Sequence, residues 1–211
     1  MTDRSSWYCG AVSSPNRPLR VDAARNREHL LAAAEAEFAE RGLSVSVADI
    51  ALRAGIAKGT VFRHFASKED LIASIVSGHL TALTGCAERL ADAADPGDAL
   101  WEFLSFAADQ RHRHNIDFLW AVSEGDARVT ELRDRLFSGI ERLVVRAHQV
   151  EAIRSDVTAS DVYLLMCAPV HAVENLPNPS PDLWKRYLGI IFDGLRPEGA
   201  NPLSEPAPTV F

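Results

Sequence analysis

The stretch that decides the fold is residues 46–68, SVADIALRAGIAKGTVFRHFASK. Two short helices are predicted here. The first begins after Ser46, which forms a capping-box pattern with Asp49 three residues later. The helices are separated at Gly55, because glycine readily adopts the positive φ that a tight turn demands. Ala51 is small enough to lie where two helices approach closely, so the stretch predicts a helix-turn-helix.

The side chains of this stretch divide into a buried and an exposed set. The apolar set expected to form a small core is Ile50, Ile56, Val61 and Phe65. The outer face of the helix predicted from about Lys58 to Phe65 then carries Lys58, Gly59, Thr60, Phe62, Arg63 and His64. Basic side chains and free backbone N–H groups at a helix start suit an approach to DNA. Lys68 begins the next predicted helix and is placed to hold a phosphate.

Outside this stretch the chain also favours helices. It contains 31 alanines, and Pro96 is the only proline between residues 19 and 168. Alanine is the best helix former, and no segment shows sustained strand alternation. We therefore expect an all-α protein of about nine helices. The predicted helices include residues 23–41, a long one starting at Asp126, and a single helix over about 160–174.

The chain divides into four predicted parts. Residues 1–18 and 197–211 are proline-containing and are expected to be flexible tails, whereas 19–79 and 80–196 form an N-terminal and a larger C-terminal domain. The net charge of the whole chain is −7, but 19–79 is neutral and the acid is concentrated after residue 80. This asymmetry is compatible with a basic surface confined to the N-terminal domain.

Several function classes are disfavoured by what the sequence lacks. It has only three cysteines, no apolar run long enough to span a membrane, and none of the common hydrolase, nucleotide or zinc-protease motifs. We expect a cytoplasmic protein that is not an enzyme and needs no cofactor. Cys86 and Cys167 are expected to be small buried side chains, a redox sensor being the alternative.

A metal site is not expected from the sequence either. The candidates near one another in the chain are His112, His114, Asp109 and Asp117. The His-x-His spacing does not place both imidazoles on one face of a helix. A polar loop is the preferred interpretation.

The stretch Val47–Leu71, with the preceding Phe-Ala-Glu-Arg-Gly at 38–42, resembles the DNA-binding domain of the TetR/AcrR family. The resemblance covers roughly residues 20–79. It implies an all-α homodimer with an N-terminal helix-turn-helix and a C-terminal effector-binding bundle. The function it implies is a transcriptional regulator, usually a repressor released from a pseudo-palindromic operator by a small-molecule effector. The alternative is an effector-binding or scaffold protein whose DNA-binding domain has decayed.

The resemblance also implies roles for single residues. Lys58 and Gly59 match positions that approach bases, while Thr60, His64 and Lys68 match positions that contact phosphates. Ser46 and Arg63 belong to the same predicted DNA-binding surface. Phe62 departs from the family, which usually has a tyrosine there, so a hydroxyl contact to phosphate is lost. Four arginines near the first helix could form an arm on DNA or a solvated helix start: Arg17, Arg20, Arg25 and Arg27.

The C-terminal part carries a looser resemblance, over residues 155–195, to some actinobacterial-type members of the family. The resemblance implies a dimer interface built from the last two helices, with Met166, Val170, Leu183, Tyr187, Leu188 and Ile191 as candidates; the alternative is that they face the core of the monomer. Candidates for an effector pocket are Trp101, Leu104, Phe118, Trp120, Phe137, Met166, Cys167 and His171. Neither set could be separated from ordinary core residues by sequence alone.

Overall fold

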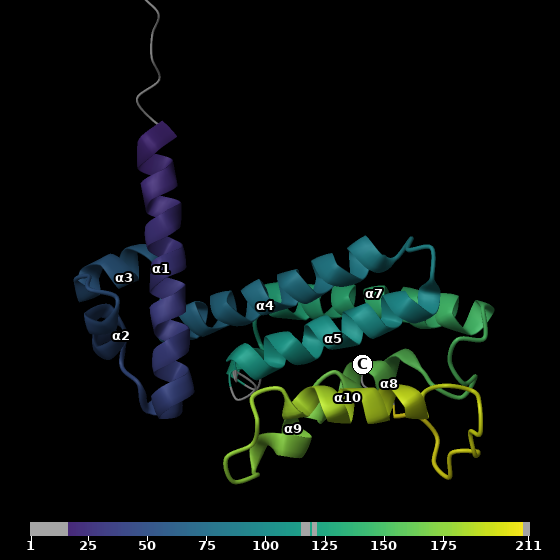
Figure 1. Ribbon diagram of the computed structural model, residues 1–211. Coiled ribbons are helices and arrows are strands. Elements are labelled where there is room, and N and C mark those ends of the chain that lie inside the picture. The colour runs from purple at the N-terminus through teal and green to yellow at the C-terminus, as the bar shows by residue number, and fades with distance from the viewer. Residues whose placement is uncertain (1–16, 115–118, 120–121, 209–211) are drawn as a thin grey trace, which may run out of the picture.

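The structure is a computed structural model that describes residues 17–114, 119 and 122–208 (Figure 1). Every regular element in these ranges is helical, which confirms the predicted all-α class. In the N-terminal part these elements are α1 Arg17–Arg41, the 3₁₀ turn η1 Gly42–Ser44, α2 Val47–Arg53 and α3 Lys58–His64. In the C-terminal part they are α4 Lys68–Leu90, α5 Pro96–His114, α7 Ala127–Gln149, α8 Ala159–Leu165, α9 Ala168–Glu174 and α10 Leu183–Gly194.

The helices form two groups joined by α4. Figure 1 shows α1, α2 and α3 gathered at one end of α4, while α5 and α7 pack along the rest of it. Helices α9 and α10 pack against α5, and α8 packs against α7. The predicted division between residues 79 and 80 therefore falls inside one continuous helix, Lys68–Leu90. Helix α4 therefore links the two groups without a break.

The packing of α4 against α7 is the most extensive between any two described helices. Gly139 of α7 faces Ala87 of α4 so closely that a Cβ added at Gly139 would lie 2.9 Å from the Cβ of Ala87. By length and apolar composition α4 could also span a membrane, but 61% of that apolar window is buried inside the protein. Its apolar character is therefore explained by its place in the core.

The first helix begins earlier than predicted. It starts at Arg17 rather than near Ala23, so residues 17 and 18 do not belong to a flexible tail. Pro18 is the second residue of the helix, where its missing N–H has no intrahelical partner to lose. The predicted end at Gly42 is confirmed, with φ of +65°.

The predicted helix over 160–174 is wrong as a single element. The chain forms α8 up to Leu165, breaks at Met166 and Cys167, and restarts as α9. Pro169 explains the break, because it lacks an N–H and its ring would clash with the carbonyl of Leu165 in a continuous helix.

The segment after α10 is not helical in its described part, but it is not detached from the protein. The backbone N–H of Arg154 donates to the Leu195 carbonyl at 2.8 Å. The guanidinium group of the same residue donates to the Asn201 carbonyl. The sequence also predicts a short helix around residues 115–123, and this segment lies largely outside the described residues.

Candidate functional site

The helix-turn-helix is built by local interactions that the sequence predicted. The Ser46 hydroxyl accepts from the backbone N–H of Asp49 (3.2 Å), and the Asp49 carboxylate accepts from the Ser46 backbone N–H (2.9 Å), which completes the capping box of α2. The hydrogen bonds from Ser46 hold the pKa of the Asp49 carboxyl below its ordinary value. Gly55 has a φ of +65°, and the next N–H, of Ile56, donates to the Ala51 carbonyl (3.0 Å).

A network of ion pairs attaches α2 to α1. Arg53 makes a bidentate pair with Glu40, at 2.6 and 2.8 Å, and reaches Glu37 at 3.2 Å. Arg41 pairs with Glu37 at 3.1 Å and with Asp49 at 3.5 Å. The hydrogen bond from Arg53 lowers the pKa of the Glu40 carboxyl. The two arginines of this network thus have their charge neutralised by carboxylates of the domain itself.

The basic side chains on α3 are in a different situation. Lys58 and Arg63 are exposed, and neither forms an ion pair with any acidic group in the described part of the chain. Phe62 is 48% exposed, and the Lys58 ammonium lies 5.9 Å from the centroid of its ring. A Cβ on Gly59 would meet nothing within 4 Å, so the backbone there is open to an approaching molecule.

The remaining predicted contact residues lie around this face. Thr60 and His64 are half-buried, whereas Val61 and Phe65 on the opposite side are buried at 1% exposure each. The predicted division of α3 into a core side and an outer side is therefore confirmed. The exposed side presents positive charge, which suits the phosphates of a nucleic acid. It also presents an open backbone and an apolar ring, which suit close contact with the edges of bases.

Lys68 and Ser46 have structural partners. The Lys68 ammonium donates to the Leu43 carbonyl of η1 and lies 5.6 Å from the ring centroid of Phe38. The Ser46 hydroxyl donates to the Asp49 carboxylate at 2.6 Å. Both residues therefore stabilise the domain in the absence of any ligand, and their predicted roles at phosphates remain predictions.

The arginines near the start of α1 are only partly described. Arg25 and Arg27 are exposed, and the Arg27 guanidinium lies 4.9 Å from the ring centroid of Phe65. This contact fixes Arg27 beside the end of α3. The side chains of Arg17 and Arg20 lie outside the described residues.

Of the predicted pocket residues, Leu104 and Met166 belong to the hydrophobic core, and Phe137 and Cys167 pack against it. Cys167 is half-buried, and His171 is exposed and bonded to Glu174 at 2.9 Å. Trp101 packs edge-on against Phe192, and Phe137 against Tyr163, with ring centroids 4.9 and 6.5 Å apart. Phe118 and Trp120 lie outside the described residues.

Helix α4 carries a row of hydroxyl groups that was not predicted from the sequence. Ser74, Ser77 and Thr84 have side-chain oxygens that are buried and lack a hydrogen-bond partner within the described residues. Their spacing of three and seven residues places them on one face of the helix. This spacing is visible in the sequence and could have identified the row. A buried hydroxyl without a partner is unfavourable, so such a face suits contact with a polar group of a ligand.

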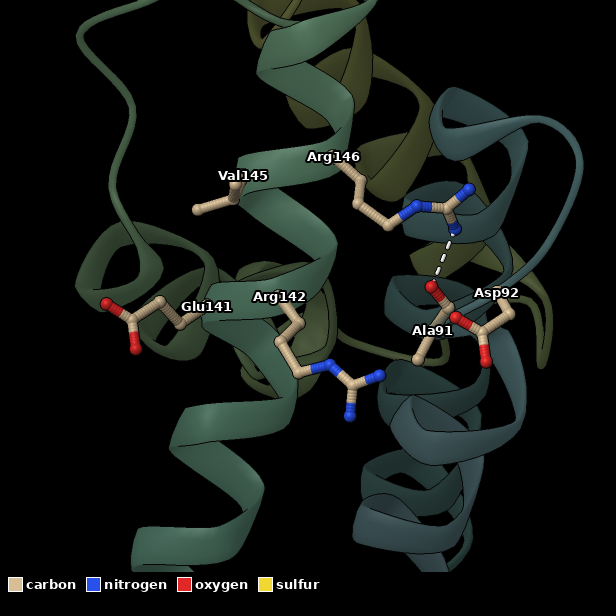
Figure 2. A pocket seen from close by; sticks show the side chains of 6 residues that line it. All are labelled: Ala91, Asp92, Glu141, Arg142, Val145 and Arg146. Carbon is tan, nitrogen blue, oxygen red and sulfur yellow. Dashed lines mark hydrogen bonds between the residues drawn. The ribbon is translucent and has the colours of Figure 1, made fainter.

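The surface also carries a shallow hollow between the end of α4 and α7, of about 330 Å³. Figure 2 shows Arg142 and Arg146 pointing from α7 toward the end of α4. Arg146 donates to the carbonyls of Ala91 and Ala93, at 2.7 Å each. These bonds satisfy carbonyl groups at the C-terminal end of α4 and just after it. The role of Arg146 in this hollow is therefore to cap a helix.

Three of the six predicted interface residues lie in the core of the protomer. Met166, Val170 and Leu188 are between 2% and 8% exposed. Leu183, Tyr187 and Ile191 are half-buried on α10. Ile190 was not singled out, yet it is 55% exposed, and its spacing of three and seven residues from Tyr187 and Leu183 places it on the same face of the helix.

Cys86 is buried and bears no disulfide, and burial raises the pKa of its thiol. A buried thiol of raised pKa is poorly reactive. This supports the expected packing role for Cys86 over the redox alternative.

Comparison with known proteins gives the following similarities. Residues 30–75 match the family model described as bacterial regulatory proteins, tetR family, and residues 95–197 match the model described as transcriptional regulator SbtR-like, C-terminal domain. The HTH-type transcriptional repressor KstR2 of Mycobacterium tuberculosis is 38% identical over 94 residues, 43% of this chain and 47% of that protein. The chain therefore spans about half the length of the curated relatives it matches.

Solved structures resemble more of the chain. A TetR transcription regulatory protein from Mycobacterium vanbaalenii is 28% identical, with a TM-score of 0.55, over 85% of this chain and 99% of that one. The TetR family regulator PfmR from Thermus thermophilus has a TM-score of 0.63 at 22% identity, over 81% of this chain and 97% of that one. The second likeness supports the fold alone.

Proposed function

Because this chain belongs to the TetR family of bacterial regulatory proteins, we propose that it is a transcriptional repressor that a small-molecule effector releases from DNA in the cytoplasm. The observation that carries this proposal is the outer face of α3, where Lys58 and Arg63 are exposed without acidic partners. The nearby Arg41 and Arg53 are both neutralised by carboxylates. Unneutralised charge on this one face gives the otherwise acidic protein a surface for DNA.

The α3 helix would enter the major groove, with Lys58 and Gly59 at base edges and Thr60 and His64 at the flanking phosphates. In a dimer the two α3 helices would lie in successive major grooves about 34–36 Å apart, on a pseudo-palindrome. Phe62 would contribute packing without the phosphate hydrogen bond that a tyrosine would make. Its exposed ring beside Lys58 suits contact with sugar or a thymine methyl group.

The test is a titration of the duplex recovered by selection from a random pool, with binding followed by fluorescence anisotropy. Lys58→Ala and Thr60→Ala are expected to weaken binding, Lys58→Ala by a factor of about 5 to 150. The control is Arg135→Ala, which removes one positive charge on α7, where Arg135 pairs with Glu88 at 2.9 Å. Equal affinity of the two α3 variants and the wild type would refute the assignment of α3.

The effector would bind in the C-terminal bundle, beside the hydroxyl row of α4. Because α4 continues into the helix-turn-helix domain, a ligand that contacts Ser77 or Thr84 could shift the whole helix. The effector must favour one arrangement of the two domains over the other to change DNA affinity. Trp101 with Phe192 and Phe137 with Tyr163 supply apolar surface in the same domain.

Thr84→Val tests this position of the effector, because valine keeps the shape of threonine and removes its hydroxyl. Compounds are first screened for release of the selected duplex. The variant is expected to need a higher concentration of the releasing compound while binding DNA normally in its absence. Thr130→Val on α7 is the control, since Thr130 is exposed and its hydroxyl donates to the Asp126 carbonyl. An equal response of both variants would contradict an effector site at Thr84.

The dimer would form through the exposed face of α10. Ile190 is the most exposed apolar side chain on that helix, flanked by half-buried Tyr187 and Leu183. Ile190→Asp is expected to convert a dimer to a monomer in light scattering, because it would bury an unpaired charge in the interface. A variant that stays dimeric would place the interface elsewhere.

A further inference from the structure

Three metal-ligating side chains meet where the helix-turn-helix domain joins the C-terminal bundle. Glu35 comes from α1, His79 from α4, and His114 is the last residue of α5. One ligand atom of each lies within 4.8 Å of the others. The Nε2 atom of His79 is 3.2 Å from Oε1 of Glu35, and Nδ1 of His114 contacts that same oxygen. The two imidazole rings pack edge to face, with centroids 4.5 Å apart.

We infer that Glu35, His79 and His114 form a binding site for a divalent transition-metal ion, with Zn²⁺ as the ion that fits best. Two imidazole nitrogens and one carboxylate oxygen are ligands that Zn²⁺ takes in proteins, with the fourth tetrahedral position left open. Mg²⁺ and Ca²⁺ prefer all-oxygen surroundings and are disfavoured by the two histidines. The ligand set therefore selects for a borderline-soft ion.

The spacing of the atoms agrees with this ion. Zinc–ligand bonds of about 2.0–2.2 Å place neighbouring tetrahedral ligand atoms about 3.3 Å apart. The atoms of His79 and Glu35 are already at 3.2 Å. An ion would enter between the three groups and replace the direct contacts of the two imidazoles with the carboxylate.

The burial of the site is also suitable. The side chains of His79, Glu35 and His114 are 15%, 19% and 34% exposed, respectively. The three side chains are therefore sheltered, and each still has a fraction of its surface exposed. His112, the other histidine of the sequence pattern, lies elsewhere, with its ring centroid 5.9 Å from that of Trp184.

The position of the site gives it a consequence that rests on the proposed function. Glu35 is on α1 close to Glu37 and Glu40, which hold α2 through Arg53. An ion bound by Glu35 and His114 would tie the helix-turn-helix domain to the end of α5. It would restrict the movement between domains by which an effector changes the spacing of the α3 helices.

The experiment measures metal binding directly, on the full chain without a histidine tag. Zn²⁺ affinity is determined by competition with a chromophoric chelator, and Co²⁺ serves as a visible-absorption probe of coordination. We expect one ion per chain and the intense absorption bands of tetrahedral Co²⁺. Glu35→Gln, His79→Gln and His114→Gln should each weaken Zn²⁺ binding at least about tenfold, since each removes a ligand. His29→Ala, on the exposed surface of α1, should bind as the wild type does.

Circular dichroism establishes that each variant is folded before its affinity is compared. The inference is overturned if the wild type binds no Zn²⁺, or if the three ligand variants bind it as tightly as His29→Ala does. DNA binding with and without Zn²⁺ is recorded separately. A chain that binds Zn²⁺ at these ligands but no DNA would support the metal site and refute the proposed function. Zn²⁺ binding with unchanged DNA affinity would support the site and overturn its coupling to α3.

Discussion

Replacing Gly139 with alanine tests how closely α4 and α7 must pack. The new Cβ would lie 2.9 Å from the Cβ of Ala87, whereas carbon atoms in contact prefer about 3.5–4.0 Å. The helices would have to separate by about 0.6 Å or more. Overpacking of this kind costs about 1–3 kcal/mol, and the higher helix propensity of alanine offsets about 1 kcal/mol. We expect a net loss of about 1 kcal/mol in the free energy of unfolding.

A compensating change separates this clash from other effects of the substitution. Ala87→Gly alone should cost about 1 kcal/mol of helix propensity and about 0.8 kcal/mol for the buried methyl group. In the double variant the methyl group has only moved from one helix to the other. The double variant should therefore be more stable than the sum of the single changes predicts, by about 1–3 kcal/mol.

The assay is urea unfolding followed by circular dichroism at one protein concentration. Gly85→Ala on α4 is the matched control, because its Cβ would meet nothing within 4 Å. It should stabilise the protein by about 0.5–1 kcal/mol. A gain of stability in Gly139→Ala equal to that of the control would contradict a clash between α4 and α7. Additive effects of the two single changes in the double variant would contradict it as well.

Further predictions concern the helix-turn-helix and its surroundings. Ser46→Ala should lower the free energy of unfolding by about 1 kcal/mol, measured in urea, because it removes the cap of α2. Gly55→Ala should lower it by about 1–2 kcal/mol, because φ of +65° is unfavourable for alanine although the space is open. Hydrogen bonds from Arg128 lower the folded-state pKa of Asp126 from 3.8 to about 2. The stability that the ionised Asp126 carboxylate provides is fully present above about pH 4 and is lost as the pH falls through 2. In an acid titration followed by circular dichroism, Asp126→Asn should therefore lose less stability over this pH range than the wild type does. Lys68→Ala should weaken binding to all DNA sequences and reduce the salt slope by about one, and an unchanged slope would exclude a phosphate contact.

The helix-turn-helix was predictable because its determinants are local. Ser46 and Asp49 are three residues apart, and Gly55 follows within the same stretch, so cap and turn could be identified together. The burial of Val61 and Phe65 followed from helical spacing alone. The early start of α1 and the break before Pro169 were not predicted. Proline is tolerated in the first turn of a helix, as at Pro18, but disrupts a helix that continues through it, as at Pro169.

The C-terminal domain was predictable only in outline. Apolar spacing on α8 to α10 shows that a face is buried, but Leu188 packs in its own protomer while Ile190 is exposed. Which neighbour covers each face depends on contacts between distant segments. The same holds for Glu35 and His114, which meet in space although they are 79 residues apart in the chain. No spacing rule links residues on three separate helices.

The proposed function is tested most directly by selecting bound sequences from a randomised duplex pool and repeating the selection at several salt concentrations. The proposed function predicts an enriched inverted repeat, bound by a dimer, with affinity that falls steeply as salt rises. A folded protein that enriches no sequence and binds DNA at no salt concentration would contradict the claim. The C-terminal bundle and its ligands would then be the place to look for the function.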